Sequence, residues 1–167
     1  MEKALKREFV FDTSALLSLA SIGILGKVSE IAIILVTPSV IKELQDFAKH
    51  LDSLGIFAGE ILEKQGIFVK AEEKINETLP HLERTDNILF NLAYNLQIPL
   101  ITDDIKFARV VGRRVEVLFS TFFLSSLVQV DLISKREALS LLERVRTLRN
   151  WEWNLIYLST KSALELI

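Results

Sequence analysis

Residues 83–104 read ERTDNILFNLAYNLQIPLITDD, and this stretch joins a helix pattern to a strand pattern. Its first part carries apolar residues at helical spacing, namely Leu89, Phe90, Ala93 and Leu96. Its last part is a short, mainly apolar run at 99–102, which is followed by two adjacent acids, Asp103 and Asp104. This pattern predicts a helix that leads into a buried strand. The two acids need an explanation, because carboxylates are rarely placed beside a core without compensation.

The same alternation of helix and strand patterns continues along most of the chain. Other apolar runs that predict strands lie at 9–11, 32–36, 67–71 and 115–119. A helix is predicted from Thr37-Pro38, a hydroxyl cap followed by proline, as far as Leu51, and Thr85 is the predicted cap of the helix in the opening stretch. Strands that alternate with helices and are apolar on both faces predict a three-layer α/β/α fold. Its central sheet should be mostly parallel, with four or five strands.

The length of 167 residues suits one domain with its own hydrophobic core. We expect a single domain over 1–167, with an α/β core over about 8–130 and a helical C-terminal extension over about 131–167. In this extension Ser134 and Glu137 have the spacing of a capping box. We expect the extension, including Trp151 and Trp153, to serve in packing or as a partner surface.

The composition excludes several classes of function. The chain has no cysteine, which excludes thiol catalysis, cysteine-ligated zinc and a disulfide scaffold. Its net charge is −2, so a role with nucleic acid must rest on a local site. Residues 1–11 lack a signal-peptide cleavage pattern, and the uncharged stretch at 117–130 is shorter than the roughly 20 residues of a membrane helix. We therefore expect a cytoplasmic protein that is not in a membrane.

Four acids lie where residues should face the core. Asp12 ends the first strand, and Glu43, Asp86 and Asp104 lie at helical spacing from apolar residues near the starts of their helices. A single acid of this kind has a structural explanation, because a carboxylate in a first turn satisfies free N–H groups. That explanation suits Asp86 and Asp104, and either Asp12 or Ser14 could cap the helix after the first strand. It suits Glu43 less well, since its helix begins several residues earlier.

The four acids together favour a metal site. In a parallel α/β fold, strand ends and the helix starts after them share one edge of the sheet, where ligands bind. Carboxylates that converge there repel one another unless a cation neutralises them, and oxygen ligands suit Mg²⁺ or Mn²⁺. Such a site can promote attack on phosphorus. His50 and His81 stand alone, and neither a Gly-x-Gly-x-x-Gly motif nor a P-loop is present.

The order of these motifs resembles that of the PIN-domain nucleases, the family of VapC-type toxin ribonucleases and their archaeal relatives. The matching segments are FVFDTSALLSL at 9–19, VTPSVIKEL at 36–44, the opening stretch at 83–104, and KFARVVGRRVEVLFS at 106–120. They follow the family's order of a strand with Asp-x-Ser, a helix with Glu, a helix with Asp, and a strand with Thr-x-Asp. The resemblance covers about residues 8–130.

The resemblance implies a Mg²⁺- or Mn²⁺-dependent endoribonuclease that hydrolyses phosphodiester bonds of single-stranded RNA, such as the toxin of a toxin–antitoxin pair. The catalytic and metal-binding acids that it implies are Asp12, Glu43, Asp86 and Asp104. Ser14 and Thr102 match auxiliary hydroxyl positions. Asp103 is a further metal-ligand candidate, expected at the rim of the site, because family members often carry a non-acid at the middle position of Thr-x-Asp.

Basic residues that flank the acids are candidates to position RNA, namely Arg84, Lys106, Arg109 and Arg113. The last three share a predicted helix face and could hold phosphates without reading bases, although a solvated face is the alternative. The implied partners are an RNA substrate, an antitoxin protein and a second copy in a homodimer.

Two other functions are less well supported by the sequence. The first is a non-catalytic PIN-fold module that binds RNA or protein, which the loss of an acid would favour, but all four acids are present. The second is a phosphohydrolase of the haloacid-dehalogenase type, which needs an acid two residues after the first Asp. Ser14 occupies that position.

Overall fold

In the part of the chain that the structure describes, five parallel strands form the central sheet. The computed structural model describes residues 6–151 and 154–167. The sheet has the order β3-β2-β1-β4-β5 and contains β1 (Arg7–Phe11), β2 (Ala32–Val36), β3 (Phe68–Lys70), β4 (Leu100–Ile101) and β5 (Val117–Leu118). Neighbouring strands are all parallel. Each strand overlaps a run that the sequence predicts, so the predicted α/β fold is confirmed.

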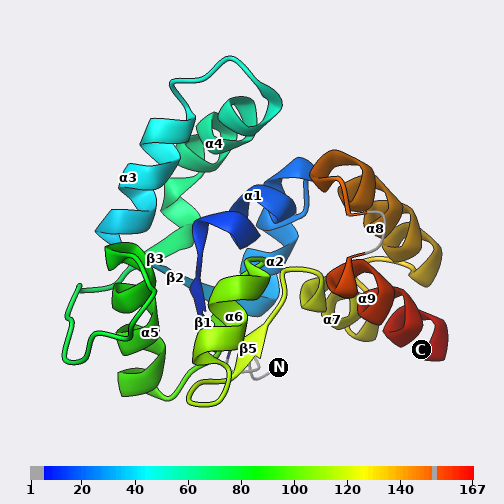
Figure 1. The fold of residues 1–167 in the computed structure, drawn as a ribbon. Coiled ribbons are helices and arrows are strands. Elements are labelled where there is room, and N and C mark those ends of the chain that lie inside the picture. The colour runs from blue at the N-terminus through cyan, green and yellow to red at the C-terminus, as the bar shows by residue number, and fades with distance from the viewer. Residues whose placement is uncertain (1–5, 152–153) are drawn as a thin grey trace.

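Helices connect the strands and continue after the last one (Figure 1). The connections from β1 to β3 contain α1 (Thr13–Ser21), α2 (Leu25–Ile31), α3 (Pro38–Phe47), α4 (Ser53–Glu63) and a short 3-10 helix (Gln65–Ile67). The connections from β3 to β5 contain α5 (Arg84–Leu96) and α6 (Ile105–Val111). The C-terminal part contains α7 (Phe122–Gln129), α8 (Lys135–Arg149) and α9 (Leu155–Leu166).

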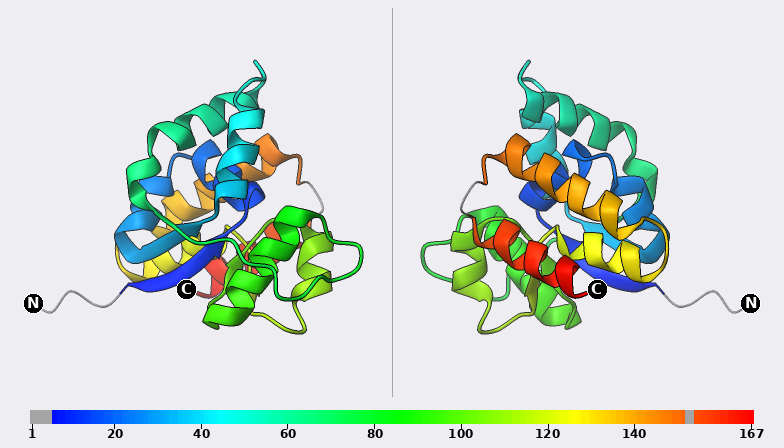
Figure 2. Two further views of the ribbon diagram at one scale, coloured as in Figure 1. Left: turned by 90° about the vertical axis from the view of Figure 1, so that its left-hand side faces the viewer. Right: turned by 90° about the vertical axis from the view of Figure 1, so that its right-hand side faces the viewer.

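Helical layers cover both faces of the sheet. The chain steps from β1 to β2 to β3 in one direction and then returns to β4 and β5 in the other. Right-handed crossovers therefore place α1 to α4 on one face and α5 and α6 on the opposite face. Figure 2 shows α5 and α6 together, apart from α1 and α2. Because α7 packs on α2 and α8 packs on α1, the C-terminal helices add to the first layer.

Two predicted helix caps are confirmed and one is wrong. The Thr37 hydroxyl accepts a hydrogen bond from the N–H of Val40 at 3.4 Å, at the start of α3. The Ser134 hydroxyl accepts one from the N–H of Glu137 at 3.1 Å, at the start of α8. Thr85 is not a cap, because α5 begins one residue before it.

The helix predicted to reach Leu51 is instead divided into α3 and α4 by a tight turn. The side chain of Asp52 caps α4 by accepting a hydrogen bond from the N–H of Gly55 at 2.8 Å. A Cβ atom at Gly55 would lie 2.0 Å from the carbonyl oxygen of His50. Only glycine permits this approach, so Asp52 and Gly55 mark the turn that apolar periodicity overlooks.

The register of β1 and β4 prepares the functional site. Phe11 is paired with Ile101, and the N–H of Asp12 donates to the carbonyl oxygen of Ile101 at 2.9 Å. The residues that follow the two strands, Asp12 and Thr102, therefore emerge side by side. They do so at the carboxyl edge of the sheet, where ligand sites form in parallel α/β folds.

The C-terminal helices share one hydrophobic core with the sheet. The Phe123 ring lies against Phe9 and Phe11, with centroid distances of 5.3 and 5.6 Å. Trp151 is buried, which agrees with the predicted packing role, whereas Trp153 lies outside the described residues.

Within the described ranges, no single helix is both long enough and apolar enough to cross a membrane. Taken together, α1 and α2 meet the criteria of length and composition, but the pair is bent by 114°.

Candidate active site

Asp12 is the centre of a polar cluster at the end of β1. Its Oδ2 accepts hydrogen bonds from Ser14 Oγ and Thr102 Oγ1, each at 2.7 Å. Asp12 occupies the N-cap position of α1, but among the described residues its side chain makes no capping hydrogen bond. The two hydroxyls orient this buried carboxylate instead. Ser14 and Thr102 thus lie beside the first acid, where the motifs predict them.

Glu43 reaches this cluster from α3. Its Oε2 accepts a hydrogen bond from Thr13 Oγ1 at 2.6 Å. Thr13 directly follows Asp12, so the first turn of α1 orients acids from two different elements. Glu43 is half-buried, which agrees with its predicted place beside the apolar stripe of its helix.

Asp86 and Asp104 approach from the opposite face of the sheet. Asp86 lies in the first turn of α5 and is half-buried. Asp104 is exposed and caps α6, because its Oδ1 accepts hydrogen bonds from the N–H groups of Lys106 and Phe107 at 2.8 and 3.0 Å. The capping explanation therefore holds for Asp104, and it does not prevent a second role.

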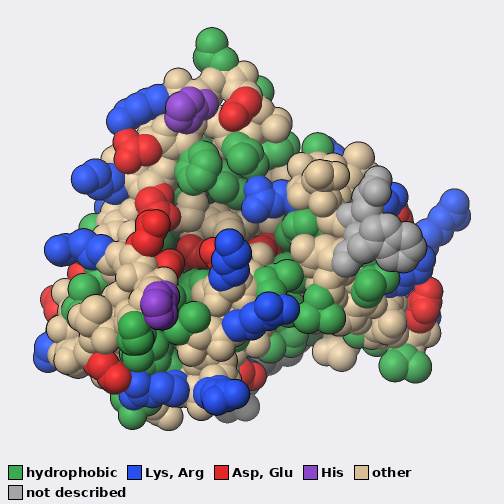
Figure 3. Space-filling view, in the orientation of Figure 1, with side chains coloured by type: hydrophobic (Ala, Val, Ile, Leu, Met, Phe, Trp, Pro, Cys, Tyr) green, Lys and Arg blue, Asp and Glu red, His purple; other side chains and the backbone are tan. Residues whose placement is uncertain are grey.

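The four acids line one cavity of about 540 Å³. Figure 3 shows acidic side chains gathered in the hollow at the centre of this face, with basic side chains around it. The cavity wall also contains three apolar side chains, Leu17, Phe47 and Leu54, and four ionisable ones, His81, Glu83, Lys106 and Arg149. The structure thus brings together all four acids that the sequence predicts to act together.

Three of the four acids are positioned through a single oxygen. The side-chain hydroxyls that orient Asp12 contact Oδ2, the one that orients Glu43 contacts Oε2, and the N–H groups capped by Asp104 contact Oδ1. A carboxylate that is held through one oxygen can offer the other to a cation. The arrangement therefore combines defined positions with ligand capacity.

Burial and mutual repulsion raise the pKa values of Asp12 and Asp86. Desolvation raises the pKa of Asp12 more than the hydrogen bonds from its two hydroxyl partners lower it. The charge of Glu43 adds to the rise. Desolvation, followed by the charges of Asp12 and Asp104, raises the pKa of Asp86 to about 6. The acids of the cavity interact electrostatically, and a bound cation would relieve their repulsion.

Asp103 is buried rather than placed at the rim of the cavity, so that expectation is wrong. The N–H of Ser120 donates to its Oδ1 at 2.9 Å, and Ser120 Oγ donates to its Oδ2 at 2.7 Å. Burial raises the pKa of Asp103, whereas these hydrogen bonds and the charge of Arg149 lower it by a smaller amount. Consecutive side chains of an extended segment point to opposite sides. Asp103 and Asp104 therefore cannot face the same site, and the burial of Asp103 gives its predicted metal role no support.

The chemistry of the donor set suits Mg²⁺ or Mn²⁺, which prefer oxygen ligands. As the side chains lie, no group of three or more Asp, Glu or His residues within the described residues is close enough to hold a metal ion. The acids reach the cavity from four elements, and Glu43, Asp86 and Asp104 are not fully buried. Metal binding at this cavity would therefore require side chains of the acids to change position.

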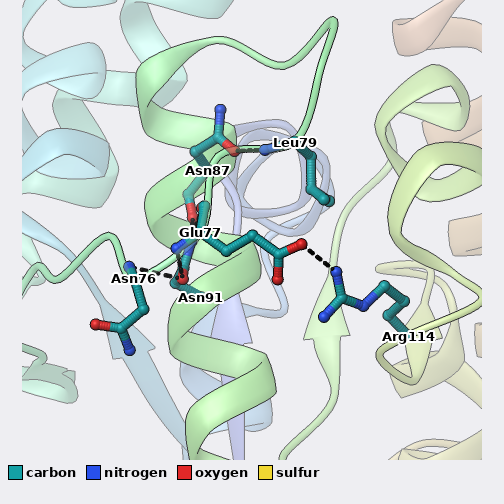
Figure 4. A network of polar contacts seen from close by, with 6 residues as sticks. All are labelled: Asn76, Glu77, Leu79, Asn87, Asn91 and Arg114. Carbon is teal, nitrogen blue, oxygen red and sulfur yellow. Dashed lines mark hydrogen bonds and ion pairs between the residues drawn. The ribbon is translucent and has the colours of Figure 1, made fainter.

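Two buried asparagines of α5, Asn87 and Asn91, hold the connection between β3 and α5 against the side of α5 through hydrogen bonds (Figure 4). Asn91 Oδ1 accepts hydrogen bonds from the N–H groups of Asn76 and Glu77 at 2.9 and 3.0 Å. Asn87 Oδ1 accepts one from the N–H of Leu79 at 2.8 Å. Both amide groups donate back to carbonyl oxygens of the connection. The connection is therefore ordered by α5, although it contains little regular structure.

Arg114 braces the same connection from the turn after α6. It forms an ion pair with Glu77 at 2.6 Å (Figure 4). Its guanidinium lies over the rings of Phe90 and Tyr94, 5.1 and 4.9 Å from their centroids. These contacts give Arg114 a structural role beside α5.

The connection places two residues at the cavity that the motifs did not indicate. They are His81, which has a positive φ of 67°, and Glu83, which precedes α5. Because Asn87 directly follows Asp86, the connection and the third acid are fixed together. The signal in the sequence is the pair of asparagines four positions apart on a core-facing helix side, because buried amides need partners.

The predicted RNA-positioning residues divide into two groups. Lys106 lines the cavity, whereas Arg84 and Arg109 are exposed and lie outside its lining. Arg113 lies beyond the end of α6 and does not share the helix face predicted for it. The cavity receives a second positive charge from Arg149, in the extension for which packing was predicted.

The structure is similar to that of a PilT N-terminus (PIN) domain protein from the hyperthermophilic archaeon Sulfolobus solfataricus. The TM-score is 0.51 and the sequence identity 18%, and the match covers 71% of this chain and 92% of the other. This chain has a PIN-domain fold. No protein-family model and no curated protein matches the sequence. The PIN fold therefore rests on the arrangement of elements, and the closer resemblance to VapC-type toxins stays a prediction.

Proposed function

We propose that this chain is a metal-dependent endoribonuclease that hydrolyses phosphodiester bonds in single-stranded RNA. The observation that carries the proposal is the convergence of Asp12, Glu43, Asp86 and Asp104 on one cavity at the carboxyl edge of the sheet. The PIN fold supports a nuclease in general. The preference for RNA comes from the resemblance of the motifs.

The donor set defines a role for each part of the site. Mg²⁺ or Mn²⁺ would be held by Asp12, Glu43, Asp86 and Asp104. Two hydroxyls orient Asp12, and Asp104 is anchored to the start of α6. The bound ion would supply the positive charge that stabilises the entering and leaving oxygens at phosphorus. Lys106 would add charge for neighbouring phosphates, and the apolar part of the wall would accept a ribose or base.

A cleavage assay with metal control and one variant tests the proposal. Wild-type protein should cleave single-stranded RNA with Mg²⁺ or Mn²⁺ and stop in EDTA, with little cleavage of the same sequence as a duplex. Asp12→Asn should lose cleavage, because it removes the charge of the central acid. The amide oxygen can still accept from Ser14 and Thr102, so the fold should survive. Cleavage in EDTA, or full activity of Asp12→Asn, would contradict the proposed mechanism.

A PIN-fold module that binds RNA or protein without cleavage is the alternative. It is favoured by the separation of the acids, since no three of them within the described residues lie close enough to hold a metal. Calorimetric titration of the protein with Mn²⁺ distinguishes the two functions. Wild-type protein that binds RNA but neither binds Mn²⁺ nor cleaves would support the alternative.

We further propose that the protein is cytoplasmic and forms a homodimer. It would act either as the toxin partner of an antitoxin or as a stand-alone relative of such toxins. These proposals rest on the resemblance alone. Light scattering coupled to size exclusion measures the oligomeric state. Co-purification with the product of an adjacent small gene tests for an antitoxin.

A further inference from the structure

The C-terminal helices deliver an arginine to the acid cavity. Arg149 is the last residue of α8 and lines the cavity with the four acids. α8 packs against α1, the helix that begins directly after Asp12 (Figure 1). Arg149 also lies outside the part of the chain, about 8–130, that carries the PIN motifs. The extension therefore contributes a side chain to the site as well as packing to the core.

The end of α8 fixes the position of Arg149. Asn150 adopts a left-handed conformation, with φ 57° and ψ 49°, and its N–H donates to the last turn of the helix. The N–H of Trp151 donates to the carbonyl oxygen of Arg146 at 2.9 Å, and Trp151 is buried. The backbone thus caps the helix end without help from the Arg149 side chain. The helix dipole favours a cation here, but it does not require the side chain to enter the cavity.

Among the described residues, the Arg149 guanidinium forms no ion pair with the acids around it. Arg149 Nε is buried and has no hydrogen-bond partner in the described part of the chain. The ion pairs found among the described residues do not include Arg149. Its charge acts on Asp103, but both oxygens of Asp103 accept hydrogen bonds from Ser120. A buried donor without a partner is uncommon, and a ligand in the cavity could accept a hydrogen bond from it.

A phosphate is the ligand that satisfies both sides of this cavity. A cation held by the acids would attract a phosphodiester, which can contact Arg149 at the same time. The planar fork of a guanidinium matches phosphate oxygens and forms strong charge-assisted hydrogen bonds with them. We propose that Arg149 binds a phosphate of the RNA at the acid cavity, so that the C-terminal extension completes the substrate site. This inference rests on the proposed function.

Binding of RNA without cleavage tests the inference. The probe is a short fluorescein-labelled single-stranded RNA in Ca²⁺, which also takes oxygen ligands. Anisotropy is measured over a range of salt concentrations, and a gel confirms that the RNA is intact. The matched control for Arg149→Ala is Arg144→Ala, which removes the same charge from an exposed position on α8.

Arg149→Ala should weaken binding about tenfold, and the salt slope should fall by about 0.7, the value for one phosphate contact on a single strand. Arg144→Ala should leave the affinity and the slope unchanged. Arg149→Lys keeps the charge but not the fork, so it should keep the slope and recover only part of the affinity. If melting shows that Arg149→Ala does not fold, the partial loss in Arg149→Lys carries the test.

Wild-type affinity and slope in folded Arg149→Ala would overturn the inference, as would full affinity in Arg149→Lys when Arg149→Ala does not fold. Tighter Mn²⁺ binding by Arg149→Ala with unchanged RNA affinity would also overturn it, by assigning Arg149 as a counter-ion of the acids. These results leave the proposed function intact. Wild-type protein that binds no RNA would instead contradict the proposed function itself.

Discussion

Asp103 accepts two hydrogen bonds from Ser120, one on each carboxylate oxygen, at 2.9 and 2.7 Å. Its neighbour Asp104 caps α6 through Oδ1 alone. The extended backbone after β4 turns Asp103 into the protein and Asp104 toward the cavity. Two adjacent acids thus have separate roles, one in holding the segment after β5 and one at the site.

Asp103→Ala should destabilise the protein. The substitution leaves the buried N–H and hydroxyl of Ser120 without their acceptor, which costs about 1–3 kcal/mol. Urea unfolding in the presence of a chelator measures the change without any contribution from metal. Mn²⁺ affinity of the folded variant should remain close to that of wild type, and a loss of that affinity with unchanged stability would restore a ligand role for Asp103.

Asp104→Asn should abolish cleavage with little effect on stability. Asparagine caps a helix about as well as aspartate, so the unfolding free energy should change by less than about 0.5 kcal/mol. The negative charge at the cavity is lost, and with it one of the four acids proposed to hold the metal. The check is RNA cleavage beside a thermal melt, and an active Asp104→Asn would mean that Asp104 serves only as a cap.

The candidate site could be predicted from sequence to the extent that local patterns determine it. Asp12 ends an apolar strand and Glu43 lies beside an apolar helix stripe, and parallel topology brings strand ends and helix starts to one edge. The burial of Asp103 depends on its contact with Ser120 after β5, and no local pattern records that contact. The sequence therefore predicts the wrong position for Asp103.

Other features escaped prediction because they depend on contacts between distant elements. Arg149 closes an ordinary amphipathic helix, and only the packing of α8 on α1 brings it to the cavity. The turn between α3 and α4 is different, because Asp52 and Gly55 are a cap and a close-approach glycine that sequence can reveal. It was missed because the apolar spacing continues across it.

Asp86→Asn should stabilise the metal-free protein at neutral pH. The folded pKa of Asp86 is raised from 3.8 to about 6, mainly by desolvation, so the folded state binds this proton more tightly than the unfolded state. The stability associated with this proton is fully present below pH 3.8 and is lost as the pH rises through about 6. At neutral pH the variant should therefore gain about 1 kcal/mol, a value reduced for the partial exposure of the side chain.

Unfolding of wild type and Asp86→Asn in EDTA at about pH 4 and about pH 8 measures this difference. The gain should appear at the higher pH and shrink at the lower one. Asp86→Asn that is equally destabilised at both values would show that the carboxylate has a structural role in the first turn of α5.

Lys106→Ala should weaken RNA binding while Arg113→Ala does not. Both substitutions remove one positive charge, but only Lys106 lines the cavity. The cap of α6 is preserved, because Asp104 contacts the backbone N–H of residue 106 rather than its side chain. The salt slope of RNA binding should fall by about 0.7 in Lys106→Ala alone. Equal losses in both variants would indicate a diffuse electrostatic effect of the exposed surface.

Asn91→Ala should release the connection between β3 and α5. The N–H groups of Asn76 and Glu77 lose the acceptor that holds them, so their amide hydrogen exchange should accelerate. Global stability should fall by about 1–3 kcal/mol, and exchange in β1 should accelerate by no more than this fall accounts for. Asn95→Ala, at an exposed position of the same helix, is the matched control.

This release should also reach the cavity, because the connection carries His81 and Glu83 to its wall. If the connection helps to bind RNA, the KM for cleavage should rise in Asn91→Ala while kcat changes less, since the quartet of acids stays in place. Hydrogen exchange followed by mass spectrometry and cleavage kinetics measure the two effects on the same sample. Unaltered exchange at residues 76 and 77 would show that the connection is held by other contacts, of which the ion pair between Glu77 and Arg114 is the strongest candidate.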